Sequence, residues 1–187
     1  MNKRELILKV ATSLFSSNGF KATSVRKIAA DSGLSVPGMF HYFSTKEEIL
    51  YEIMFNFIED GYTKVTEIIE SDIGPAQKLE LLCDYYVQKY TKRQEELVIL
   101  SFEGKSLTPK HQKQFNKTQQ NVVKAIGDFL NELIRQNKVK PINPTVLTFL
   151  FYGMVHWTST WYDTKGEVSP EKLGEIVREV FLHGIFK

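Results

Sequence analysis

Apolar residues recur every three or four positions along most of the chain, a spacing that is typical of amphipathic α-helices. Gly and Pro, often beside Asn or Ser, interrupt the pattern where one helix would end and the next begin. We find no convincing alternation of apolar and polar residues that would indicate a strand. The chain is therefore predicted to be all-α, with nine helices over residues 3–18, 25–31, 36–42, 45–70, 75–93, 95–105, 109–136, 144–162 and 170–182.

The second and third of these helices meet in a short turn, which is the pattern of a helix-turn-helix. Thr23 or Ser24 can cap the first helix of the pair, and Gly33 can adopt the left-handed conformation that ends it. Leu34 can then enter the core while Ser35 caps the next helix. The helix over residues 3–18 is expected to brace this pair from behind, which makes a three-helix module.

The helix that begins at residue 36 carries an exposed edge. Pro37 lies in its first turn, where the missing N–H is not needed. The periodicity turns Met39 and Phe43 inward. The outer edge then consists of Val36, Pro37, Gly38, His41 and Tyr42.

The following helix opens with Ser44-Thr45-Lys46-Glu47, which indicates a capping box formed by Ser44 and Glu47. Lys46 then lies at a helix N-terminus, where the free backbone N–H groups already favour an anion. A lysine at this place suggests that the site binds a phosphate.

Charge is distributed unevenly along the chain. Residues 1–50 hold seven basic and four acidic side chains, a net charge of +3. The other 137 residues hold 17 basic and 18 acidic side chains, a net charge of −1. The basic excess therefore belongs to the helix-turn-helix end, as DNA binding requires.

Residues 10–50 resemble the DNA-binding domain of the TetR family of bacterial transcription regulators. The features that match are Leu14-Phe15, Gly19-Phe20, Thr23, Ile28-Ala29, Gly33-Leu34-Ser35, Phe40-His41-Tyr42-Phe43 and Lys46-Glu47. Members of the family commonly carry Gly or Ala at the position of Pro37, Thr or Ser at that of Gly38, and Tyr at that of Phe40. Phe40 lacks the hydroxyl that donates to a phosphate in relatives, so this contact is not expected here.

The resemblance implies a DNA-binding domain over residues 1–47 and a helical ligand-binding and dimerisation domain over residues 48–187. Arg26 and His41 are expected to contact base edges. Arg26 is chosen because a guanidinium pairs bidentately with guanine. Lys3 either reaches the DNA backbone or is part of a solvated terminus. The expected DNA-binding residues are Lys3, Thr23, Ser24, Arg26, Ser35, Val36, Pro37, Gly38, His41, Tyr42 and Lys46, with Thr23, Ser35, Tyr42 and Lys46 assigned to phosphates.

Residues 141–162 contain no charged side chain. A membrane span is rejected, because two prolines, His156 and several hydroxyl residues leave only about 18 helical residues for the hydrocarbon layer. A helix that is apolar all round is instead expected to be buried in a core or an interface. In the TetR family the last two helices usually form the dimer interface, which implies a homodimer with interface residues Phe149, Gly153, Trp157, Thr160, Val177 and Phe181.

Residues 157–173 are also similar to a stretch of the TetR-type regulators that sense acyl-CoA thioesters. This similarity implies a small hydrophobic effector, with candidate contacts Tyr152, His156, Trp157 and Trp161. The alternative is that Trp157, Trp161 and Tyr162 are ordinary interface residues, and the sequence favours this alternative.

The chain shows no pattern of an enzyme. Its four histidines and its only cysteine, Cys83, have neither metal-ligand spacing nor a nucleophile–base motif, so no catalytic residue, metal or cofactor is expected. One cysteine allows no internal disulfide, and no signal peptide precedes the first helix, which indicates a cytoplasmic protein. We expect a ligand-responsive repressor that binds a palindromic operator as a dimer; the alternative is a helical protein-interaction module that does not bind DNA.

Overall fold

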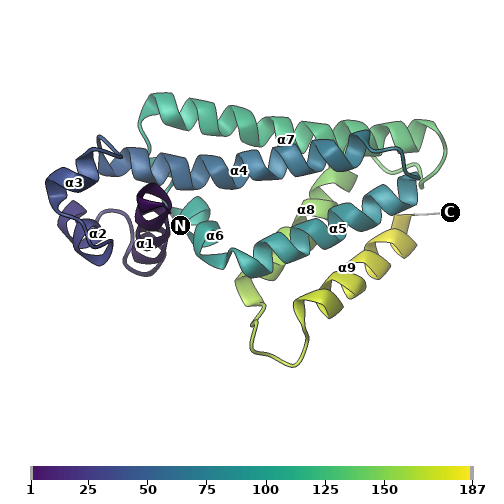
Figure 1. Ribbon diagram of the computed structural model, residues 1–187. Helices are drawn as coiled ribbons and strands as arrows, with labels where there is room; N and C mark the ends of the chain where they lie inside the picture. Colours follow the sequence, from purple (N-terminus) through teal and green to yellow (C-terminus); the bar gives the residue numbers. More distant parts are fainter. Residues whose placement is uncertain (1, 186–187) are drawn as a thin grey trace. The chain divides into compact units, whose positions relative to one another are not determined.

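The computed structural model describes residues 2–185, apart from the side chain of Ser159. Figure 1 shows that this part of the chain folds into helices joined by short loops, so the all-α prediction is confirmed. The described helices are α1 (Lys3–Asn18), α2 (Val25–Asp31), α3 (Val36–Phe40), α4 (Lys46–Glu70), α5 (Pro75–Lys92), α6 (Gln94–Phe102), the short 3-10 turn η1 (Gly104–Ser106), α7 (Pro109–Arg135), α8 (Pro144–Trp161) and α9 (Pro170–Ile185).

Three helices end more than one residue away from the predicted position. Helix α3 stops at Phe40, two residues early, and α6 stops at Phe102 because the chain turns through η1 and brings Leu107 into the core. Helix α9 continues through Gly184, because this glycine does not adopt a positive φ. Among the described glycines, positive φ occurs at Gly19 and Gly33.

The described chain divides into two compact units. The first comprises residues up to 60 together with residues 95–118, and the second comprises residues 61–94 together with residues 119–185. This division differs from the predicted boundary between residues 47 and 48, because the first part of α4 and residues 95–118 share one core with the helix-turn-helix.

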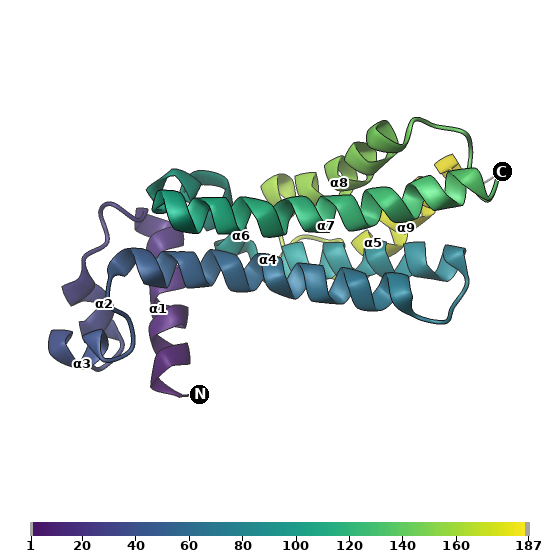
Figure 2. The ribbon, with the colours of Figure 1, turned by 90° about the horizontal axis from the view of Figure 1, so that it is seen from above.

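The first unit is built around the beginning of α4. Figure 2 shows α1, α2 and α3 gathered there, with α2 in contact with both α1 and α3. Met39 and Phe43 are buried, as the periodicity predicted. The core consists of Ile7, Ala11, Phe15, Ile28, Ala29, Met39, Phe43, Ile49, Leu50, Ile53, Met54, Ile99, Leu107 and Phe115.

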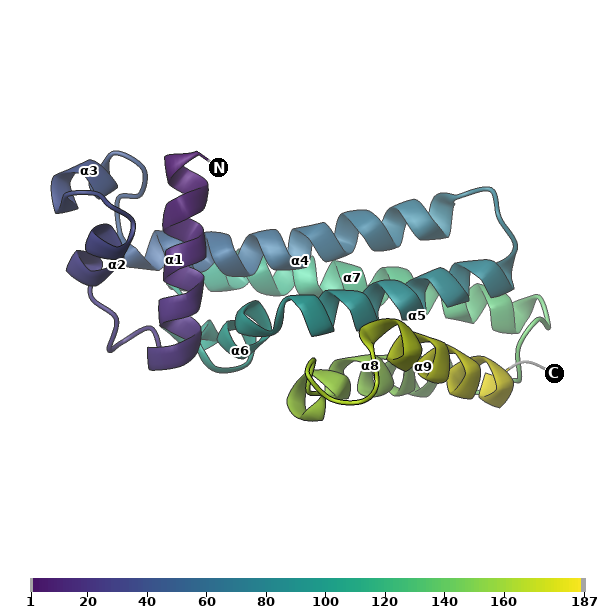
Figure 3. The ribbon, with the colours of Figure 1, turned by 60° about the horizontal axis from the view of Figure 1, so that its bottom comes forward.

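The second unit is organised by α5, which packs against α8 and α9 (Figure 3). Buried aromatic rings join the three helices. The ring of Phe151 on α8 packs edge-on against those of Tyr86 on α5 and Phe181 on α9, with 5.6 and 5.4 Å between ring centroids. Helices α5 and α9 approach closely at Gly174, where a Cβ atom would lie 3.3 Å from Oδ1 of Asp84. Among the described residues, no helix is long and apolar enough to cross a membrane.

Candidate nucleic-acid interface

The turn between α2 and α3 is fixed by backbone hydrogen bonds at the end of α2. The N–H of Gly33 donates to the carbonyl of Ala30 at 3.0 Å, and the N–H of Leu34 donates to that of Ala29 at 2.9 Å. This pair of bonds requires a left-handed backbone conformation at the residue after the helix, and Gly33 adopts this conformation with φ +65°. Leu34 then packs against the core that contains Ala29.

Serine side chains cap both helices of the pair. Ser24 is the N-cap of α2, and its hydroxyl accepts from the N–H of Lys27 at 3.1 Å. Ser35 caps α3 by accepting from the N–H of Gly38 at 3.1 Å. The predicted choice between Thr23 and Ser24 therefore falls on Ser24.

The outer side of α3 faces solvent. Ser35, Pro37, His41 and Tyr42 are exposed, while Val36 and Gly38 are partly buried. Phe40 is 46% exposed, although it is a large apolar residue. The structure thus brings the predicted α3 residues together on one accessible surface.

Three basic residues near this surface differ in their engagement. Arg26 is exposed and has no hydrogen-bond or ion-pair partner among residues 2–185. Lys27 forms an ion pair with Asp31 at 2.9 Å, and Arg4 pairs with Glu52 while its guanidinium lies over the ring of Phe43. Lys3 and Ser24 are exposed as well. Arg26 is therefore the guanidinium that is best prepared to bind an external partner.

Thr23 does not lie where a phosphate contact would need it. It is only 4% exposed, and its hydroxyl donates to the carbonyls of Gly19 at 2.9 Å and Leu14 at 3.2 Å. The predicted contact through this side chain is a misassignment, because the hydroxyl joins the end of α1 to the start of α2.

Lys46 is also engaged within the chain. Its Nζ donates to the carbonyls of Phe20 at 2.6 Å and Thr23 at 2.7 Å and lies 4.2 Å from the centroid of the Phe20 ring. Burial lowers the pKa of this ammonium, and the negative charge of Glu103 opposes that effect. Two of the three N–H donors are thus in use, and a phosphate contact of Lys46 stays a prediction that rests on the third.

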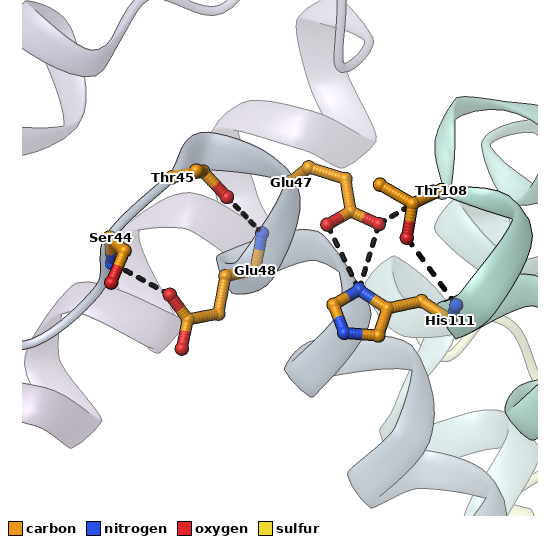
Figure 4. A network of polar contacts seen from close by, with 6 residues as sticks. All are labelled: Ser44, Thr45, Glu47, Glu48, Thr108 and His111. Carbon is orange, nitrogen blue, oxygen red and sulfur yellow. Dashed lines mark hydrogen bonds and ion pairs between the residues drawn. The ribbon is translucent and has the colours of Figure 1, made fainter.

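The cap of α4 lies one residue beyond its predicted position. Thr45 accepts from the N–H of Glu48 at 3.0 Å, and the Glu48 carboxylate accepts from the N–H of Ser44 at 2.6 Å (Figure 4). The prediction that Ser44 pairs with Glu47 is wrong, since the carboxylate of Glu47 points to α7 instead and binds Thr108 and His111. The two adjacent glutamates made the register ambiguous in the sequence.

A second surface lies on α8 and α9 of the other unit. Phe149, Gly153, Trp157 and Thr160 are exposed, as predicted, with Trp157 at 66%. Val177 and Phe181 are buried at 7% and 3% exposure, so their assignment to a subunit interface is wrong. The outward apolar residues of α8 and α9 are Val146, Phe149, Leu150, Trp157, Trp161, Ile176 and Val180, which we call the α8/α9 face.

The four candidate effector residues separate into two pairs. Trp157 and Trp161 belong to the α8/α9 face. Tyr152 lies instead against α5, where its hydroxyl is 3.2 Å from that of Tyr86, and the ring of His156 packs edge-on against Tyr90 at 5.4 Å.

Burial governs the protonation of this tyrosine cluster. It raises the pKa of Tyr152 to about 12, which the hydrogen bond to Tyr86 partly opposes, and it raises the pKa of Tyr86 and Tyr90 as well. Partial burial likewise lowers the pKa of His156. The cluster is thus uncharged near neutral pH and offers hydroxyl groups in an aromatic environment.

Comparisons with protein families match nearly the whole chain. Residues 7–53 match the family described as bacterial regulatory proteins, tetR family. Residues 72–185 match the family described as tetracyclin repressor-like, C-terminal domain.

Similar proteins extend over the full length. The HTH-type transcriptional repressor KstR2 of Mycolicibacterium smegmatis is 27% identical over 186 residues, which cover 98% of this chain and 91% of that protein. The structure of the ketosteroid transcriptional regulator KstR2 of Mycobacterium tuberculosis superposes with a TM-score of 0.89 at 23% identity, covering 100% of this chain and 96% of that one.

A second similar structure is that of AibR in complex with isovaleryl coenzyme A and operator DNA. It superposes with a TM-score of 0.84 at 23% identity and covers 96% of this chain and 97% of that one. Because the families that match are those of regulators, the chain is a regulatory protein and not an enzyme. The chain belongs to the TetR family, and it is a DNA-binding transcriptional regulator.

Proposed function

We propose that the chain is a repressor that binds a palindromic operator as a homodimer and is released by a small hydrophobic effector. The observation that carries the proposal is the exposed outer side of α3, held by the Gly33 turn in a chain of the TetR family. The relative from Mycolicibacterium smegmatis is named a transcriptional repressor, which supports repression as the direction of control. Operator binding would place the protein in the bacterial cytoplasm.

Base edges are read by Arg26 and His41 in this proposal. Both are exposed beside α3, and the guanidinium of Arg26 has no competing partner among the described residues. Ser35, Tyr42 and Lys3 bind phosphates, which position the protein but do not specify the sequence. Val36, Pro37 and Gly38 carry little bulk at the start of α3, so that its backbone can approach the groove closely.

The homodimer forms through the α8/α9 face. A twofold axis places the same surface on both protomers, and large exposed apolar surfaces on a soluble protein commonly mark such contacts. Ile176 and Val180 take the places first assigned to Val177 and Phe181. A dimer also suits DNA, since two recognition helices then enter major grooves about 34–36 Å apart.

An acyl-CoA is the effector class that we assign. The AibR structure contains isovaleryl coenzyme A, and this chain has the same fold. Tyr152 and His156 are the effector contacts that we keep, because Tyr152 holds a protonated hydroxyl that can donate to a carbonyl such as that of a thioester. Trp157 and Trp161 are assigned to the dimer instead.

The mechanism of release follows from linkage. An effector that binds better to the protein free of DNA weakens operator affinity by the same factor by which the operator weakens effector binding.

The test is a selection of genomic fragments by the purified protein at near-physiological salt, repeated with a mixed acyl-CoA pool. We expect enrichment of a palindrome with half-sites one helical turn apart and loss of this enrichment with acyl-CoA. No enrichment at any salt concentration would refute operator binding. Enrichment that acyl-CoA leaves unchanged would refute the effector class alone.

A further inference from the structure

A carboxylate and an imidazole from distant parts of the chain meet beside the helix-turn-helix (Figure 4). Nδ1 of His111, in the first turn of α7, lies 3.0 and 2.9 Å from the two carboxylate oxygens of Glu47, in the first turn of α4. The two side chains are only 23% and 17% exposed. Since a carboxylate accepts and does not donate, Nδ1 must carry a proton.

Two further contacts fix this pair. The N–H of Thr108, the residue before α7, donates to Oε1 of Glu47 at 2.7 Å. The ring of Tyr51, one turn along α4, stacks on the imidazole with 3.9 Å between centroids and 12° between planes. Glu47 therefore receives a backbone donor and an imidazole from α7, and the imidazole is held in its orientation by the stacked ring.

The first turn of α4 is anchored in three directions by consecutive residues. Lys46 binds the carbonyls between α1 and α2, Glu47 binds α7, and Glu48 binds the N–H of Ser44 in the loop that follows α3. Only residues 41–45 separate this turn from α3. These contacts therefore restrict the position of α3 relative to the first turn of α4.

We propose that His111 is a positioning residue for operator binding: its imidazole holds Glu47 and thereby fixes the first turn of α4 behind the recognition helix α3. The inference rests on the proposed operator binding. A recognition helix that is already fixed loses less conformational freedom when it binds, so affinity is higher. His111 lies outside the residues 7–53 that match the DNA-binding family, and its side chain contacts Glu47 and Tyr51 of α4.

Rescue by a conservative variant separates this role from a merely structural one. Glu47 requires a donor at the place of Nδ1 of His111, which the side-chain amide of glutamine can supply and the side chain of leucine cannot. A variant that restores the donor should therefore also restore operator affinity.

The test compares the wild-type chain with His111→Leu, which removes the donor to Glu47, and with His111→Gln, which keeps one. Operator affinity is measured by fluorescence anisotropy, and unfolding of the same samples is followed in urea. We expect His111→Leu to bind about threefold more weakly than wild type, the scale of a lost interaction between partly exposed groups, and His111→Gln to recover most of this loss. Gln112→Ala, on the adjacent exposed position, should match wild type.

A second background completes the design. In a Glu47→Ala background, which removes the acceptor, the difference between His111→Leu and the unsubstituted His111 should vanish. Operator affinity of His111→Leu equal to that of wild type, whatever its stability, would overturn the inference while leaving operator binding intact. A wild-type chain that binds no operator would overturn the proposed function and this inference with it.

Discussion

Two adjacent residues of α9 should respond in opposite ways to substitution. Val180 is 59% exposed on the α8/α9 face, whereas Phe181 is 3% exposed and packs against Phe151. Full burial of a valine is worth about 1.5–3 kcal/mol, so its exposed part would contribute roughly 1–2 kcal/mol per protomer, or about 2–4 kcal/mol across a twofold interface. Val180→Glu should therefore raise the dimer Kd by about 30- to 700-fold, and the desolvation of two carboxylates should add to this.

Phe181→Ala should instead act within the protomer. A buried phenylalanine replaced by alanine costs about 3–5 kcal/mol of unfolding free energy, because the cavity that remains is only partly filled. An exposed substitution such as Val180→Glu should change that quantity by no more than about 0.5 kcal/mol in the monomer.

The assay combines sedimentation over a range of concentrations with urea unfolding. Unfolding is measured below the dimer Kd, because dimerisation would otherwise contribute to apparent stability. Gln120→Glu adds the same charge on the exposed side of α7 and should leave both quantities unchanged. A Val180→Glu protein that remains as dimeric as wild type, or a Phe181→Ala protein that dissociates without loss of stability, would refute the assignment of the two faces.

Four other substitutions test the DNA-binding and effector regions. Arg26→Ala should lose roughly 1–3 kcal/mol of operator affinity and relax the sequence preference, whereas Lys46→Ala should mainly lower the urea midpoint of unfolding. Mobility shifts on operator variants measure the affinity and preference, and urea unfolding measures the midpoint. Equal changes of these quantities in the two proteins would contradict the prediction. Thr23→Val should cost about 1–2 kcal/mol of unfolding free energy and leave the salt dependence of DNA binding unchanged. A flatter salt dependence would instead support a phosphate contact of Thr23. Burial raises the pKa of Tyr152 to about 12, so the neutral phenol stabilises the fold up to about pH 10 and this contribution is lost as the pH rises toward 12. Tyr152→Phe should therefore flatten the decline of the urea midpoint over that interval, and an unchanged decline would count against the effect.

The helix-turn-helix could be predicted from the sequence because its determinants are local. The left-handed Gly33, the serine caps and the spacing that buries Met39 and Phe43 all act over a few residues, and the structure contains each of them. Local backbone preferences and helical periodicity are sufficient for such features.

Only the tertiary structure decided which side chains of a helix are buried and which partners the polar side chains bind. Both apolar stripes of α9, Ile176 with Val180 and Val177 with Phe181, repeat every four residues, so periodicity alone cannot tell which one packs on α5. Thr23 and Lys46 have the chemistry of phosphate ligands, yet carbonyl groups at the end of α1 bind the Thr23 hydroxyl and those of the loop between α1 and α2 bind the Lys46 ammonium.

The contact of Glu47 with His111 likewise joins residues 64 positions apart. The sequence by itself therefore determined the helices, the turn of the helix-turn-helix and the family of the chain. The partners of its polar and apolar surfaces required the fold, because contacts between distant residues depend on how the helices pack rather than on local preference.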